Sequence, residues 1–189
     1  MKRRLAWSLL SALALTTSVA WADEVKDVET HFTQKTPEHV IQVLTSYAQT
    51  CAEGCKYLAP NVKQYVVVDY QKTADHWYVW NWITSAVKDL KYFNEVKKIT
   101  KPDGTTLLVI KLVTDSATIE KLEKATGKTH QTNFDSTKSV ISVRKQDDGR
   151  TKIVQDMSVV ASGMMTVFTG QIKDGMKESA KANFANVEK

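Results

Sequence analysis

The chain has 189 residues, with 26 basic and 21 acidic side chains and a formal net charge of +5. Three of the basic residues lie at the extreme N-terminus, so the rest of the chain has 23 basic and 21 acidic side chains, a net charge of +2. No segment concentrates basic residues, which argues against a nucleic-acid partner. The length suffices for one domain with a hydrophobic core of its own.

The first 22 residues predict a cleavable signal peptide. Lys2, Arg3 and Arg4 precede a short apolar run, and Ala20-Trp21-Ala22 matches the A-x-A cleavage pattern. The alternative, a membrane anchor, is disfavoured because about a dozen apolar residues cannot span roughly 30 Å of hydrocarbon. We therefore expect removal of residues 1–22, a single domain over residues 23–189, and a periplasmic location.

The only two cysteines, Cys51 and Cys55, lie four residues apart in C-A-E-G-C. An oxidising compartment favours a disulfide between such a pair. Residues four apart on a helix are about 6 Å from each other, within the range that a disulfide spans. We expect a structural bridge, while two free thiols and redox or zinc chemistry remain as alternatives.

Periodicity and capping residues predict the elements that follow. Alternation indicates a strand over residues 25–34. Thr36, Pro37 and Glu38 are typical of a helix start, and apolar residues at helical spacing continue that helix to the cysteines. A second short helical turn is expected before Pro60. Period-two alternation then predicts six strands, at about 62–71, 75–84, 91–100, 105–114, 138–147 and 150–161.

Two more helices are predicted in the second half of the chain. Asp115 or Ser116 caps a short helix that Gly127 ends. The chain closes with a long helix from Met164 to Val187. Its apolar residues are spaced three or four apart and form one stripe: Met165, Phe168, Ile172, Met176, Ala180, Phe184 and Val187.

Two stretches resemble a known family. H-F-T-Q-K-T-P-E-H-V-I-Q-V-L, followed by A-P-N-V-K-Q-Y-V-V-V, is similar to the first strand, first helix and proline-led second strand of the START-like or Bet v 1-like superfamily. S-V-V-A-S-G-M-M resembles its passage from the last strand into the terminal helix. The superfamily includes polyketide cyclase-like and coenzyme Q-binding START-like proteins, and this chain resembles an exported bacterial member.

The resemblance implies an α+β helix-grip fold. In this fold a curved, antiparallel, seven-stranded sheet wraps around a long C-terminal helix, with a short helix pair after the first strand. An apolar cavity lies between the sheet and the terminal helix. The resemblance further implies that the cavity holds a hydrophobic ligand.

The second of the six strands contains D-H-W-Y-V-W-N-W-I, which is largely apolar on both faces. Pairing with the preceding strand places Tyr78 opposite Val68 and Trp80 opposite Val66. We expect the even-numbered positions to face the cavity and the odd-numbered ones, such as Trp77, to face outward. Ordinary core packing is an open alternative for each ring. The expected ligand-binding residues are Val66, Val68, Tyr78, Trp80, Trp82, Met157, Val159, Met165, Phe168 and Ile172.

The insertion at 115–137 is longer than neighbouring strands require, and long connections are commonly functional or disordered. Ile119 and Leu122 share one face of its predicted helix, and Phe134 follows. We expect these three residues to contact the cavity rim as a lid that gates ligand exchange. A surface elaboration with no role in binding is the alternative.

No sequence motif indicates catalysis: the chain has no H-E-x-x-H, nucleophile elbow or glycine-rich phosphate loop. We therefore assign no catalytic residue, cofactor or metal ligand. The expected function is an exported, soluble binding or carrier protein for a lipid or other hydrophobic small molecule. We expect a monomer without a nucleic-acid partner, and transient membrane contact is left open. The alternatives are a cyclase- or hydrolase-type enzyme on the same fold, and a partner-binding envelope protein with a filled core.

Overall fold

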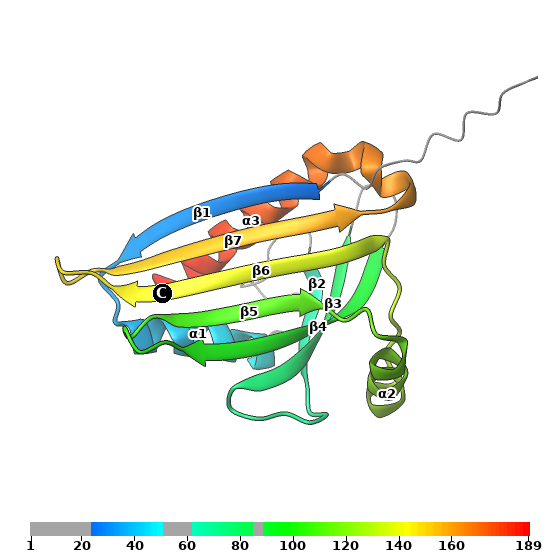
Figure 1. The fold of residues 1–189 in the computed structure, drawn as a ribbon, viewed down its shortest axis with the longest axis horizontal. Helices are drawn as coiled ribbons and strands as arrows, with labels where there is room; N and C mark the ends of the chain where they lie inside the picture. The colour runs from blue at the N-terminus through cyan, green and yellow to red at the C-terminus, as the bar shows by residue number, and fades with distance from the viewer. Residues whose placement is uncertain (1–23, 51–61, 85–88) are drawn as a thin grey trace, which may run out of the picture.

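The computed structural model describes residues 24–50, 62–84 and 89–189 (Figure 1). The predicted signal peptide, the cysteine pair and the second helical turn before Pro60 lie outside the described residues and stay predictions. Within the described part of the chain, no helix is long and apolar enough to cross a membrane.

Seven strands form one antiparallel sheet in the order β1-β7-β6-β5-β4-β3-β2. Only β1 joins the sheet out of chain order, by pairing with β7. The strands are β1 Glu24–Thr33, β2 Val62–Val68, β3 His76–Thr84, β4 Asp89–Thr100, β5 Thr106–Leu112, β6 Phe134–Lys145 and β7 Thr151–Ala161. All seven predicted strands are therefore present, although the predicted start of β6 was four residues late.

The helices are α1 Pro37–Thr50, α2 Ser116–Thr126 and α3 Thr169–Val187, with a 3-10 helix η1 at Gly163–Phe168. Figure 1 shows α1 and α3 behind the sheet and α2 apart from both, beyond the end of β5. This arrangement is the predicted helix-grip architecture, in which the sheet wraps around the C-terminal helix.

The predicted apolar stripe holds α3 against the sheet. Met176, Ala180 and Val187 are buried, and Ile172 and Phe184 pack partly buried beside them. The stripe begins in η1 rather than in an α-helix as predicted. Its first two members, Met165 and Phe168, are three residues apart, which is the period of a 3-10 helix, so both lie on one face of η1.

Polar contacts fix the C-terminal end of α3. The Asn183 side-chain amide donates to Oε1 of Gln155 on β7 over 3.0 Å, and both residues are buried. Near the C-terminus, His31 of β1 contacts the Glu188 carboxylate at 2.6 Å and stacks on the Phe184 ring. These contacts join the helix to β7 and β1, the strands that lie farthest along the sheet from β2.

Both predicted ends of α2 are confirmed. Asp115 is the N-cap, and its carboxylate accepts from the Thr118 backbone N–H at 2.8 Å. Gly127 ends the helix in the left-handed conformation, with φ of 66°, and its N–H donates to the Glu123 carbonyl. The polar insertion therefore contains a well-capped helix of three turns.

Replacing Gly127 with alanine should lower the free energy of unfolding by about 1–2 kcal/mol, because a left-handed backbone strains an L side chain. A Cβ there would meet no atom within 4 Å, so the effect isolates the backbone. Gly170→Ala is the matched control: it also meets nothing within 4 Å, but it lies in α3. We expect it to stabilise by about 0.4–1 kcal/mol. Urea unfolding measures both, and effects of the same sign would contradict the assignment.

Candidate ligand cavity

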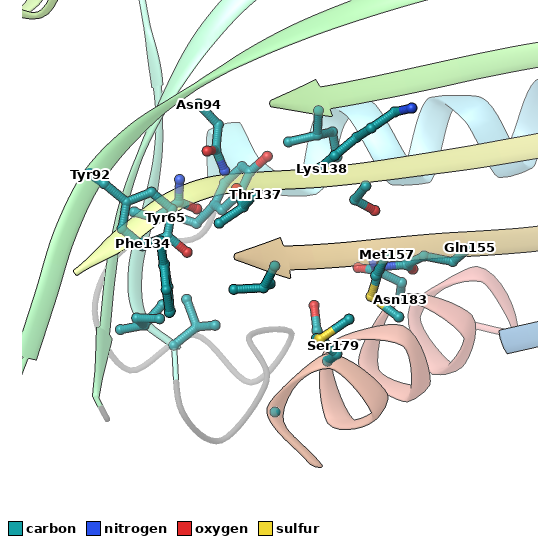
Figure 2. Close-up of a pocket in the computed structure, with 18 of the residues that line it drawn as sticks. Tyr65, Tyr92, Asn94, Phe134, Thr137, Lys138, Gln155, Met157, Ser179 and Asn183 are labelled. Carbon is teal, nitrogen blue, oxygen red and sulfur yellow. The ribbon is translucent and has the colours of Figure 1, made fainter. Parts of the chain in front are cut away.

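A cavity of about 250 Å³ lies between the sheet and α3. The sheet wall comes from β2 to β7, and η1, α3 and Leu44 and Thr45 of α1 close the other side. Figure 2 shows Tyr92, Asn94 and Phe134 around one end of the cavity, and Met157 of β7 near Ser179 of α3. The cavity therefore occupies the position that the helix-grip architecture predicts.

Half of the expected ligand-binding residues line this cavity. They come from β7, η1 and α3, and they are Met157, Val159, Met165, Phe168 and Ile172. Their side chains are apolar and include two thioethers, which adapt to irregular ligand shapes. Their position in the wall is observed, while their contact with a ligand stays a prediction.

The other half was assigned to the wrong face of the sheet. Tyr78, Trp80 and Trp82 do not line the cavity, whereas Trp77 and Asn81 of the same strand do. Val66 and Val68 of β2 likewise pack on the far face. The predicted pairings are confirmed, since Val66 lies opposite Trp80 and Val68 opposite Tyr78. Side chains along a strand alternate between the two faces of the sheet. The strand pairing was therefore correct, but assigning one residue to the wrong face assigned every expected cavity residue of β2 and β3 to the wrong face.

The misplaced residues form a second core, which we call the outer-face cluster. Its buried members are Val68, Tyr78, Trp80, Phe93, Val113 and Leu122. Val66, Tyr70, Trp82 and Ile119 pack against it. The insertion supplies its cover, because Leu122 is fully buried there and the Trp80 indole N–H donates to the Thr129 carbonyl at 2.9 Å.

The lid prediction is therefore wrong for two of its three residues. Ile119 and Leu122 pack on the outer-face cluster and do not line the cavity. The insertion is also tied to β4, where the Phe93 backbone N–H donates to Nδ1 of His130 at 3.2 Å. Phe134 does line the cavity, but as the first residue of β6, and its ring meets Tyr92 edge-on with centroids 6.1 Å apart.

The polar groups of the cavity wall were not among the predicted site residues. Asn81 is 5% exposed and Asn94 is 8% exposed, and both line the cavity. Among the described residues of the cavity wall, three polar side-chain atoms are buried without a hydrogen-bond partner: Asn81 Nδ2, Asn94 Oδ1 and Ser139 Oγ. Asparagine is depleted in strands, so N between two tryptophans and N after Y-F were signals that the sequence offered.

Burial shifts the pKa of Tyr92 in the cavity wall and of His130 on the far face of the sheet. Burial raises the pKa of the Tyr92 phenol to about 12. On the far face, burial lowers the pKa of His130, whose ring stacks on Phe93 with centroids 6.0 Å apart. Across residues 24–50, 62–84 and 89–189, no three His, Cys, Asp or Glu side chains gather to hold a metal ion.

Comparison with known proteins relates the chain to solved structures alone. No protein-family model matches it, and no curated protein matches it. The fold is similar to a STAR-related lipid transfer protein fragment from Xanthomonas axonopodis, with a TM-score of 0.65, 11% identity, and coverage of 87% of this chain and 86% of that one. Human StAR-related lipid transfer protein 5 gives a TM-score of 0.56 at 14% identity over 85% and 74% of the two chains.

A third similar structure is the ZhuI aromatase/cyclase from a Streptomyces species, with a TM-score of 0.56 at 10% identity over 87% of this chain and 92% of that one. These structures share an architecture with the chain at very low identity. The chain therefore has a START-like, helix-grip fold, which confirms the fold that the sequence resemblance implied.

The raised pKa of Tyr92 predicts a loss of stability at high pH. The unfolded chain releases the phenol proton near pH 10, but the folded chain holds it to about pH 12, so stability falls between these values. The expected loss is up to about 2–3 kcal/mol. Tyr92→Phe should remove the part of the pH dependence of unfolding that comes from Tyr92 ionisation and should leave the part that comes from other groups. Urea unfolding of both proteins from pH 8 to 12 measures the difference, and parallel curves would contradict the assignment.

Proposed function

We propose that the protein is a carrier that binds a small, mostly apolar molecule in the cavity between the sheet and α3. One observation carries the proposal: apolar side chains from both layers, among them Trp77, Met157 and Met176, form the larger part of the cavity wall, and polar residues form the rest. Ligand sites are typically such concave, apolar spaces with few polar groups. The lipid-transfer proteins of similar fold support this function over a filled core.

The volume limits the size of the bound part. A cavity of about 150 Å³ lined by apolar side chains holds benzene, so 250 Å³ accommodates roughly ten non-hydrogen atoms. Each buried methylene contributes about 0.8 kcal/mol, so eight of them contribute about 6 kcal/mol before the cost of association. The proposed ligand is therefore a short chain, a small ring system, or one segment of a larger lipid.

The carrier proposal includes export to the periplasm through residues 1–22. It rests on the basic start, the apolar run and the A-x-A site of that segment. The full chain, expressed in a Gram-negative host, should accumulate in the periplasmic fraction with an intact mass that begins at Asp23. A cytoplasmic protein that retains Met1 would contradict export but would leave the proposal of ligand binding in the cavity unaffected.

A tryptophan test distinguishes the cavity from the far face of the sheet. The chain beyond residue 22 has three tryptophans, of which Trp77 lines the cavity while Trp80 and Trp82 do not. We expect 1-bromo-4-propylbenzene to quench the emission of the wild-type protein through contact of its bromine with Trp77. Trp77→Phe should lose most of this quenching, and Trp80→Phe should keep it.

Trp80→Phe is a matched control because both rings are buried on the same strand and are replaced by the same residue. Circular dichroism and thermal unfolding check that both variants fold. Quenching lost equally in both variants, or absent from the wild-type protein, would contradict binding in the cavity.

A further inference from the structure

The cavity wall holds an amide donor and an amide acceptor that bind nothing within the described part of the chain. Asn81 Nδ2 on β3 and Asn94 Oδ1 on β4 are both buried and unpartnered. An unpaired buried polar group costs free energy that an apolar side chain of the same shape would not. The wall holds these two amide groups on adjacent strands, besides Ser139 Oγ on β6, and unpaired polar groups that line a cavity point to a function in binding.

The sheet places these two amides side by side. Asn81 lies opposite Tyr92, and Asn94 is two residues along β4 on the same face, so the two are diagonal neighbours. Diagonal positions on paired strands are about 7–8 Å apart. A donor and an acceptor at this separation, which do not bond to each other, leave space for one group between them. Figure 2 shows the Asn94 amide directed from β4 into the cavity.

The charge of the wall restricts what that group is. Lys138 is the one charged residue among the described cavity-lining side chains, and it is exposed. A carboxylate or ammonium group beside the two asparagines would be buried without an opposite charge, which is strongly unfavourable. A neutral group with both an acceptor and a donor satisfies Asn81 and Asn94 together.

We propose that the cavity selects apolar molecules with a neutral, hydrogen-bonding head, such as a carboxamide or an alcohol, held between Asn81 and Asn94. This inference rests on the proposed carrier function and specifies the ligand of that site. The head accepts a hydrogen bond from Asn81 Nδ2 and donates one to Asn94 Oδ1, while the apolar part fills the space toward Met157 and α3.

The test is isothermal titration calorimetry with five probes of matched size. They are 3-phenylpropanamide, 3-phenylpropan-1-ol, 3-phenylpropanoate, 3-phenylpropylammonium and propylbenzene. We expect the amide and the alcohol to bind at least about fivefold more tightly than the hydrocarbon, and the two ions to bind most weakly. This comparison uses the wild-type protein and does not depend on the folding of a variant.

Asn81→Leu and Asn94→Leu then locate the effect. Each should weaken amide binding by about 5- to 100-fold, because one hydrogen bond to a buried group is lost. Each should leave propylbenzene binding within about twofold. The empty protein provides a second measurement: Asn94→Leu should raise the melting temperature by about 2–4 °C, since it removes an unpaired buried group.

Gln155→Leu is the matched control for stability. Gln155 is also a buried amide in the cavity wall, but it is paired with Asn183, so its loss should lower the melting temperature. If all five probes fail to bind, both the carrier function and this inference are overturned. If propylbenzene binds but the amide binds no more tightly, or both asparagine variants keep the wild-type ratio, water satisfies the amides and only this inference is overturned.

Discussion

The contact between α3 and the sheet is the interaction on which the rest of the structure depends. The apolar stripe packs closely at Ala180 and Val187, which are both fully buried. The Gln155–Asn183 hydrogen bond holds the helix to β7 at the same end. The cavity lies beside this contact, and its lining runs along η1 and α3 from Met165 to Asn183. The contacts of α3 with β1 and β7 therefore hold the helix in place while a space remains beside it.

The sheet can enclose a cavity on one face because its other face is packed independently. The outer-face cluster is covered by α2 and is closed at its edge by cationic side chains. The Trp82 ring has the ammonium groups of Lys63 and Lys91 at 5.0 and 4.6 Å, and its indole N–H donates to Asp89. Such contacts stabilise a half-buried aromatic ring where the edge of the cluster meets solvent. The strands β3 and β4 are therefore anchored even where the cavity leaves them without full packing on the inner side.

The sequence predicted the elements, the caps of α2 and the pairing of β2 with β3, because each depends on local periodicity or on residues close in the chain. It did not predict which face of β3 lines the cavity. Tyr78 and Trp80 are as apolar as Trp77, so composition did not distinguish the faces, and the face was decided by where α2 packs. The polar sites were missed for a related reason: Asn81 and Asn94 lie on different strands, and only the register brings them together.

The two-sided packing of β3 and β4 separates two properties along one stretch of chain. Alternate positions belong to different layers, so Trp77 and Asn81 shape the cavity while Tyr78 and Trp80 hold α2. Substitutions at the cavity-facing positions can change ligand preference without uncovering the aromatic surface beneath α2. Substitutions at the positions that face α2 can change solubility without altering the cavity. A library randomised at alternate residues of these strands would therefore vary recognition independently of resistance to aggregation.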